Sequence, residues 1–267
     1  MKRFLLFCFF AVLISASILN AENAGVYMGS KPLGLEFKTS TATEGPTGSL
    51  LFTSPGVGSK GNKSIGTGLS YVNLDGDISD DLYQFPVSFS YTPIDKLDLT
   101  IALPVIKIED IDAGLGDIYA SAKIGLDILQ NYDMKSAFMF GLGLPTGAER
   151  FTGTDNKMDI MFDFPVEKEF ENCVLNLDLG LSYFDINSDN KENIFKIACG
   201  ISRSFTKNIG GSIDMVYQDG STFSSLIAGL GLKYNLNSNQ SANLSIGRDL
   251  HKSGLDLLVS FGFSNSF

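Results

Sequence analysis

The chain has 267 residues, a formal net charge of −10, 28 glycines and no tryptophan. This length is compatible with one large β domain, because sandwiches and barrels reach it without dividing. The acidic balance excludes nucleic acid as a partner, since binding phosphate requires a basic surface.

A secretory signal peptide is predicted over residues 1–21. Lys2 and Arg3 precede an apolar run over residues 4–18, and Ala21 provides a small residue for cleavage. The run is shorter than the roughly 20 residues that a membrane-spanning helix needs. The mature chain is therefore expected to begin at Glu22 and to be exported.

Residues 22–63 show no sustained alternation of apolar and polar residues. We expect them to form a plug inside a barrel or a periplasmic strap. The alternative is one more hairpin, built from 33–39 (LGLEFKT) and 48–54 (GSLLFTS). That hairpin would raise the strand number from twelve to fourteen.

From residue 64 onward, apolar residues alternate with small or polar ones, which is typical of strands with one apolar face. In 83–92, for example, Tyr83 and Phe85 share one side, whereas Gln84 and Ser88 share the other. Each segment is long enough to cross a membrane as a tilted strand, which takes about 9 to 11 residues. The segments are 64–73, 83–92, 96–107, 115–128, 135–145, 157–167, 172–185, 193–205, 208–218, 224–236, 241–250 and 254–267.

A soluble β-sandwich also has alternating strands, but they are usually about five or six residues long and turn their apolar faces inward. Here the chain instead ends in an apolar stripe that only Leu258 and Asn265 interrupt. We therefore predict an all-β fold, a transmembrane antiparallel up-and-down β-barrel of twelve strands over 64–267. The stripe consists of Leu255, Leu257, Val259, Phe261, Phe263 and Phe267.

An even strand number places both ends of the barrel on the periplasmic side of a bacterial outer membrane. Short turns are then expected on that side and longer loops outside, with loop 146–156 shaping the mouth. Arg203 and Arg248 fall in the outward phase, but both lie near strand ends. A charge there costs only about 0 to 1 kcal/mol, compared with about 2 to 4 kcal/mol at the bilayer midplane.

The inward phase is predicted to line a lumen that carries more acid than base. Carboxylate rings favour cations over anions, although single carboxylates can also pair with lysines and stabilise the wall. The acidic positions are Asp98, Asp117, Asp127, Asp159, Asp163, Asp178, Asp214, Asp249 and Asp256, and the basic ones are Lys123, Lys196 and Lys233.

Enzyme chemistry has little support in the sequence. The one histidine, His251, lies in a predicted loop beside Asp249 and Ser253, and neighbours in a loop seldom converge as nucleophile, base and orienting group. We find no zinc-ligand spacing, phosphate loop or dinucleotide fingerprint. We therefore expect neither catalysis nor a metal or cofactor.

Three stretches resemble, in the same order, motifs of the outer-membrane transporter family named after the MetA pathway of phenol degradation. They are 83–105 (YQFPVSFSYTPIDKLDLTIALPV), 114–126 (GLGDIYASAKIGL) and 140–150 (FGLGLPTGAER). The resemblance implies an outer-membrane barrel and passage of small or hydrophobic compounds. It also implies that Asp117, Lys123 and the 145–147 segment (PTG) are wall or loop determinants. The last segment, with Phe261, Phe263 and Phe267, resembles the signal that such barrels present to the barrel-assembly machinery.

The leading hypothesis is an outer-membrane barrel that lets small solutes cross passively, in contact with outer-membrane lipid and lipopolysaccharide. The alternative is a closed barrel that acts as a scaffold or a surface adhesin without a conducting path. Inward glycines favour the first hypothesis, whereas the modest strand number allows the second, because barrel width grows with strand number.

Overall fold

The computed structural model describes residues 53–74, 81–108, 113–147, 158–184, 192–220, 224–251 and 255–267. Within these ranges, no helix has the length and apolar composition needed to cross a bilayer. The predicted signal peptide, most of 22–63 and most of the predicted extracellular loops lie outside the described residues.

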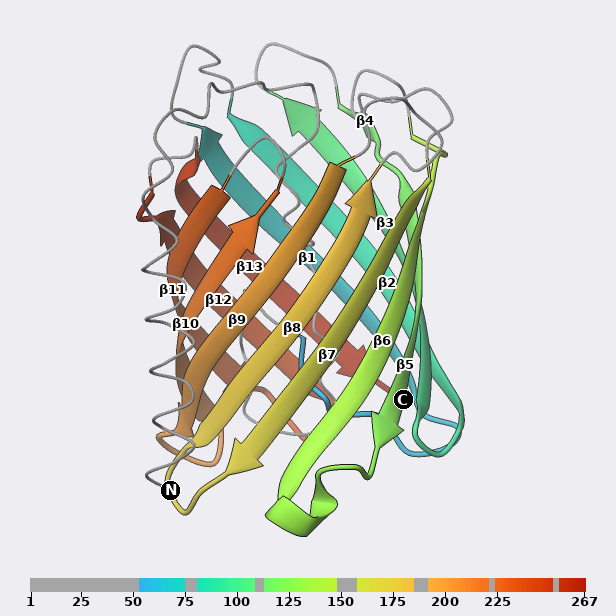
Figure 1. The fold of residues 1–267 in the computed structure, drawn as a ribbon, viewed down its shortest axis with the longest axis vertical. Coiled ribbons are helices and arrows are strands. Elements are labelled where there is room, and N and C mark those ends of the chain that lie inside the picture. Colours follow the sequence, from blue (N-terminus) through green and yellow to red (C-terminus); the bar gives the residue numbers. More distant parts are fainter. Residues whose placement is uncertain are drawn as a thin grey trace.

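Twelve long strands and one two-residue strand make up the fold (Figure 1). The predicted segments agree with the long strands to within a few residues at each end. The strands are β1 (Lys63–Leu74), β2 (Leu82–Ile94), β3 (Leu97–Ile108), β4 (Gly114–Leu115), β5 (Ile118–Leu126), β6 (Met134–Leu144), β7 (Asp159–Glu169), β8 (Val174–Phe184), β9 (Glu192–Ser204), β10 (Ile209–Asp219), β11 (Ser224–Asn235), β12 (Gln240–Asp249) and β13 (Leu255–Ser266).

The sheet closes on itself between the first and last strands. β1 pairs antiparallel with both β2 and β13, and every other long strand pairs with its two sequence neighbours. The final phenylalanine takes part in this closure, because Phe267 N donates to Lys63 O at 2.8 Å and Lys63 N donates to Phe267 O at 3.2 Å. The prediction of a closed, antiparallel, twelve-stranded barrel is confirmed.

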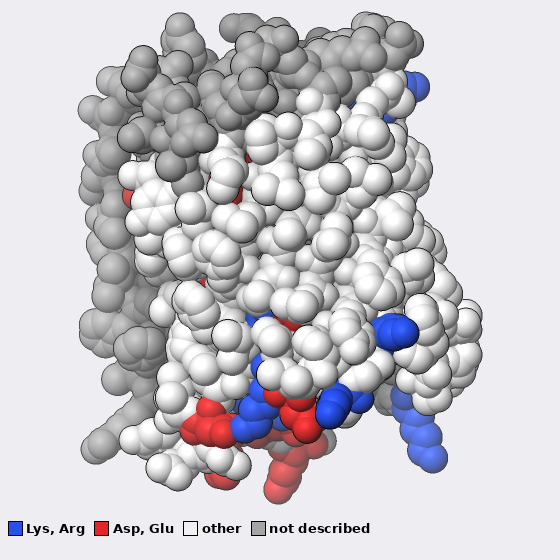
Figure 2. All heavy atoms as spheres, turned by 90° about the vertical axis from the view of Figure 1, so that its right-hand side faces the viewer, with Lys and Arg blue, Asp and Glu red and all other residues white. Residues whose placement is uncertain are grey.

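The outer wall exposes the apolar stripe of each strand. In β10, Ile213 is 63% exposed, and its partners on either side, Ile201 in β9 and Leu230 in β11, are 51% and 56% exposed. On the face drawn in Figure 2, charged side chains gather at the lower end and the band above them is mostly uncharged. A continuous exposed apolar wall of this kind requires lipid as its neighbour.

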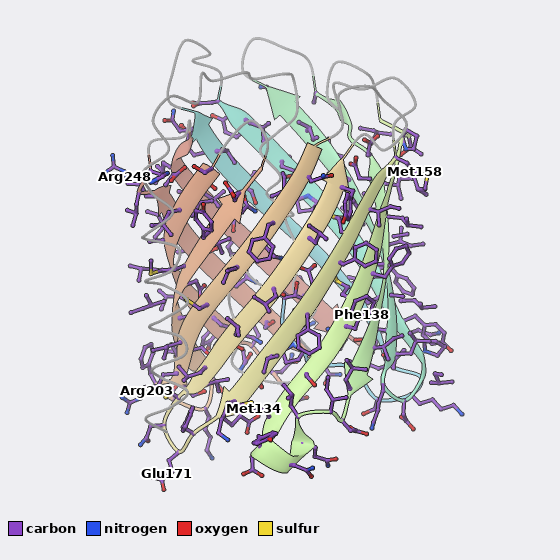
Figure 3. The ribbon with its side chains drawn as sticks, in the orientation of Figure 1. Met134, Phe138, Met158, Glu171, Arg203 and Arg248 are labelled. Atoms are coloured by element: carbon purple, nitrogen blue, oxygen red, sulfur yellow. The ribbon has the colours of Figure 1, made fainter. Side chains whose placement is uncertain are left out.

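The two outward arginines lie where the sequence predicts. Arg203 lies near the end of β9 and Arg248 near the end of β12, and both point away from the wall at opposite ends of the barrel (Figure 3). Each guanidinium can therefore reach the polar interface of the membrane, where its cost is small.

The fourth predicted segment is not one continuous strand. It breaks at Gly116 and Asp117, between β4 and β5. A Cβ atom on Gly116 would lie 2.8 Å from Ile106 Cδ1, so glycine permits the close approach, and Gly116 N donates to Pro104 O at 2.9 Å. The periplasmic turn that follows β5 contains a short 3-10 helix, η1 (Gln130–Tyr132), which alternation alone could not predict.

Candidate functional site in the lumen

Three charged side chains on adjacent strands form the centre of the lumen wall. Lys196 Nζ in β9 lies 2.5 Å from Asp163 Oδ1 in β7 and 3.1 Å from Asp178 Oδ2 in β8. The side chains are 13%, 2% and 0% exposed, respectively. Charged side chains are tolerated away from water only when they are paired. The stability of this triad therefore depends on the distances between its three charged groups.

Gly180 makes room for the triad. A Cβ atom there would lie 2.7 Å from both Asp163 Oδ1 and Lys196 Cε. We predict that Gly180→Ala displaces the ammonium group and destabilises the folded barrel by about 1 to 3 kcal/mol, as overpacking usually does.

The measurement is the free energy of unfolding in urea for the barrel folded in detergent. Gly61→Ala is not a suitable control, because Gly61 has a φ of 86° that alanine disfavours. Gly125→Ala is a suitable control, because the added Cβ atom would lie no nearer than 3.4 Å to another atom, which is ordinary van der Waals contact. Equal stability of Gly180→Ala and the parent would contradict the prediction.

The chain before β1 lies inside the barrel. We call residues 53–62 the lumenal segment. Its backbone binds wall side chains of different strands: Thr53 N donates to Asp178 Oδ2 at 3.1 Å, and Gly58 N lies 3.2 and 3.3 Å from the two Asp98 oxygens. Because β8 and β3 are far apart around the barrel, the segment crosses the lumen between them.

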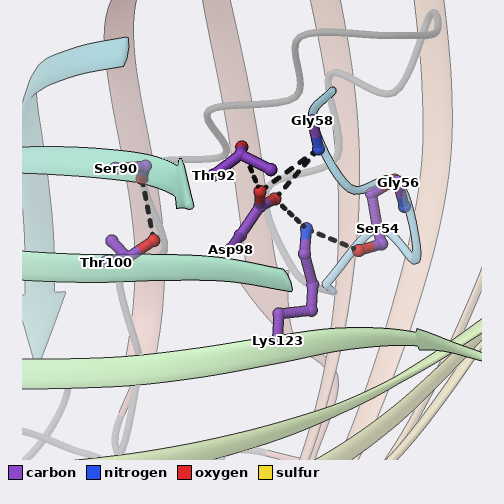
Figure 4. A network of polar contacts seen from close by, with 8 residues as sticks. All are labelled: Ser54, Gly56, Gly58, Ser90, Thr92, Asp98, Thr100 and Lys123. Atoms are coloured by element: carbon purple, nitrogen blue, oxygen red, sulfur yellow. Dashed lines mark hydrogen bonds and ion pairs between the residues drawn. The ribbon is translucent and has the colours of Figure 1, made fainter. Parts of the chain in front are cut away.

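Asp98 and Lys123 hold the middle of the lumenal segment (Figure 4). Asp98 Oδ1 accepts from Thr92 Oγ1 at 2.6 Å, and Asp98 Oδ2 lies 3.8 Å from Lys123 Nζ. Lys123 Nζ in turn donates to Ser54 O at 3.3 Å. The wall therefore binds this segment mainly through backbone groups, which most sequences could supply.

The lumenal segment leaves the lumen at the end of the barrel that the sequence predicts to be periplasmic, which we call the periplasmic end. Lys60 N donates to Asp95 Oδ1 at 3.0 Å in the turn between β2 and β3, and Gly61 N donates to Thr92 O at 2.7 Å. The chain then enters β1 at Lys63. Residues 53 and 54, which belong to the alternative fourteen-strand hairpin, are not in a strand.

The opposite end of the lumen is lined by large aliphatic side chains, which we call the apolar arc. All are 1 to 7% exposed and lie within three residues of the strand end nearest the predicted extracellular loops. Val72 pairs directly with Leu258 and Leu82, and Val216 pairs with Ile227. The members are Val72, Leu82, Ile106, Ile194, Val216, Ile227 and Leu258.

Sequence reasoning missed the apolar arc. The inward phase is small and polar over most of each strand, and the aliphatic residues occupy that phase only near one end. The one visible signal was Leu258, which interrupts the final stripe because its side chain is on the lumen side and is 1% exposed.

The other predicted lumen residues take several positions. Asp214 is fully buried and accepts from Ser212 Oγ at 3.2 Å, while Asp159 and Lys233 are each 7% exposed. Asp117 accepts from Thr146 N at 3.1 Å and Gly147 N at 2.9 Å, which ties the break before β5 to the end of β6.

Asp127 does not lie on the lumen wall. Asp127 lies beyond the end of β5, where it pairs with Lys96 at 2.5 Å, and the two side chains are 63% and 57% exposed. β5 ends at Leu126, so the alternation of inward and outward side chains does not extend to Asp127. The side chain of Asp256 lies outside the described residues.

Asp249 accepts from Leu226 N at 3.1 Å and His251 N at 2.8 Å.

The sequence matches the model of the family described as "Putative MetA-pathway of phenol degradation" over residues 47–267. The chain belongs to this family. No protein of curated function matches the sequence. The family match covers the whole barrel and the lumenal segment, so the order of motifs noted in the sequence is confirmed as a family relationship.

Solved structures with the same fold are known. The outer-membrane channel from Pseudomonas putida F1 is similar with a TM-score of 0.59 and 10% identity, over 79% of this chain and 97% of that one. The KdgM porin in complex with disordered oligogalacturonate is similar with a TM-score of 0.56 and 12% identity, over 76% of this chain and 99% of that one. The NanC porin has a TM-score of 0.53 and 6% identity, over 77% and 98%. At these identities the likeness establishes a shared fold.

Proposed function

We propose that this protein is an outer-membrane channel through which small solutes move passively. The observation that carries the proposal is that the barrel admits a peptide segment of its own chain. The lumenal segment crosses between Asp178 and Asp98, so the interior is wide enough to hold a polypeptide backbone. A lumen of that width can pass a small solute when the segment moves aside.

The wall chemistry supports a preference for cationic over anionic solutes. Within the described residues, carboxylates outnumber ammonium groups among the buried or half-buried inward charges, and Lys135, which lies 3.6 Å from Glu167, is 60% exposed. The carboxylates are those of Asp98, Asp117, Asp159, Asp163, Glu167, Asp178, Asp214 and Asp249, and the ammonium groups are those of Lys123, Lys196 and Lys233. Fixed carboxylates lower the potential of a pore and concentrate cations in it. The apolar arc adds a stretch of apolar wall that disfavours strongly hydrated ions, because it cannot replace the hydrogen bonds of their hydration water.

The route to the membrane is part of the same proposal. Residues 1–21 direct export, and the terminal stripe with Phe261, Phe263 and Phe267 presents the barrel to the assembly machinery. Phe261 and Phe267 are 51% and 63% exposed, so both are accessible on the outer wall. Once inserted, the exposed apolar wall contacts outer-membrane lipid and lipopolysaccharide.

A disulfide between the lumenal segment and the wall tests the proposal. The Cβ position of Gly125 lies 3.4 Å from Val57 Cγ2, which suits the spacing of a disulfide. We expect Val57→Cys with Gly125→Cys, in a Cys173→Ser and Cys199→Ser background, to conduct several-fold less in planar bilayers when oxidised than when reduced. In a salt gradient, the reduced channel is expected to select cations.

The cysteine-free background with and without reductant is the matched control. A channel that conducts equally in the oxidised and reduced states would show that the lumenal segment does not obstruct the path. An absence of conductance, even after deletion of residues 22–57, would favour the alternative of a non-conducting scaffold or surface barrel.

A further inference from the structure

Three polar side chains on β8 and β9 follow one another in a row on the lumen wall, in the order Ser202, Asn176 and Asp178, and have unused hydrogen-bonding groups. Asn176, Asp178 and Ser202 are 3%, 0% and 1% exposed. Both amide atoms of Asn176, Oδ1 of Asp178 and Oγ of Ser202 have no hydrogen-bond partner among the described residues. We call these three residues the β8–β9 polar cluster.

Strand register brings the cluster together. Asn176 and Asp178 are two residues apart in β8, so their side chains share the lumen face. Asn176 lies opposite Gly200 in β9, and Ser202, two residues further along β9, lies opposite Val174. Gly200 places no side chain between Asn176 and Asp214, which lies opposite Gly200 in β10.

The unused groups are costly unless something binds them. Burying an amide, a hydroxyl or a carboxylate oxygen without a partner forfeits its hydrogen bonds to water. Buried polar groups in folded proteins are almost always satisfied, and clusters of exceptions mark sites for water or a ligand. Asp178 uses its Oδ2 atom for both Lys196 and Thr53, while its Oδ1 atom has no partner among the described residues.

We propose that the β8–β9 polar cluster binds a small primary amine that also carries a hydroxyl or carbonyl oxygen. The ammonium group donates to Asp178 Oδ1 and Asn176 Oδ1, and the solute oxygen accepts from Asn176 Nδ2 or Ser202 Oγ. A bare alkali cation would leave the Asn176 amide nitrogen without an acceptor. An uncharged polyol would gain nothing from the acidic wall.

This inference deepens the proposed function, because it names a solute class for the same lumen. The lumenal segment borders the cluster, since Thr53 binds the other oxygen of Asp178. Solute binding and movement of the segment are therefore coupled through one carboxylate. Binding itself can be measured whether or not the barrel conducts.

Isothermal titration calorimetry of the mature barrel, folded in detergent at constant ionic strength, tests the inference. The probes are ethanolamine, n-propylamine, which lacks the oxygen, and ethylene glycol, which lacks the charge. We expect ethanolamine to bind, and each of the other two to bind about tenfold more weakly, as loss of one buried hydrogen bond or charge contact implies.

Asn176→Ala should weaken ethanolamine binding by about tenfold. The barrel should still fold, because the amide has no protein partner to lose. The matched control is Asn243→Ala, which removes an inward asparagine that lies against Gly262 in β13, away from the cluster. Ser202→Ala provides a second test, paired with Ser245→Ala, whose hydroxyl already contacts Ser260 Oγ at 2.9 Å.

Three outcomes would overturn the inference. If none of the probes binds, the cluster holds water only. Equal binding of ethylene glycol and ethanolamine would remove the role of the charge. Ethanolamine binding that survives both Asn176→Ala and Ser202→Ala would place the amine elsewhere. Failure of the channel proposal would be separate, because it appears as absent conductance with calorimetric binding intact.

Discussion

Replacing Ile213 by arginine is expected to destabilise the membrane-inserted barrel by about 2 to 4 kcal/mol. Ile213 lies near the middle of β10, is 63% exposed, and is flanked by the exposed side chains of Ile201 and Leu230. A guanidinium at this depth must leave water or thin the bilayer. The measurement is the free energy of unfolding in urea for the barrel folded into lipid vesicles.

Ile209→Arg is the matched control on the same strand and the same outward face. Ile209 is the first residue of β10 and is 41% exposed at the periplasmic end, beside Tyr234. Its cost should be only about 0 to 1 kcal/mol. If the two variants lose equal stability in vesicles, or if neither loses any, then the exposed wall does not face hydrocarbon.

Lys196→Met is expected to destabilise the barrel by about 3 to 5 kcal/mol. Methionine keeps much of the side-chain volume but leaves Asp163 and Asp178 without the ammonium group that lies 2.5 and 3.1 Å from them. Removing one partner of a buried ion pair costs more than the pair contributes, because a charge is left away from water. Unfolding in urea, with the barrel in detergent, measures the loss.

The exposed pair of Lys96 and Asp127 provides the control for Lys196→Met. Lys96→Met should cost at most about 1 kcal/mol, because both side chains are more than half exposed. Adding Asp163→Asn and Asp178→Asn to Lys196→Met should recover most of the loss, since the uncompensated charges disappear. A triple variant as unstable as Lys196→Met would mean that packing, and not charge, explains the effect.

The two ends of the lumen have different chemistry, and this matters for any solute that crosses it. The periplasmic half contains the lumenal segment and the charged groups that hold it, including Asp98 and Lys123. The other end is lined by the apolar arc, with Val72 and Leu258 as direct neighbours. A solute that crosses the lumen must therefore lose hydration water at the apolar arc. At the other end it must compete with the lumenal segment for the polar groups of the wall.

Several features of the barrel were predictable because they follow from local pattern. A period of two assigns each side chain to one face of its strand, so the apolar wall around Leu230 and the inward aspartates Asp163 and Asp178 could be placed in advance. Asp127 shows the limit of this reasoning. Its phase is inward, but the phase has no meaning once β5 has ended at Leu126.

The sequence by itself predicted a barrel of twelve strands, with fourteen as the alternative, and it predicted the membrane-facing side of each strand and the family. Only the tertiary structure decided which inward groups meet: that Lys196 lies between two carboxylates, that Thr53 reaches Asp178, and that Asn176 and Ser202 have unused groups beside Gly200. The physical reason is that the face of a strand on which a side chain lies follows from its position in the chain, with a period of two residues. Contact across the lumen depends on register and on closure, and the closure joins β1 to β13, whose paired residues are 181 to 202 positions apart in the chain.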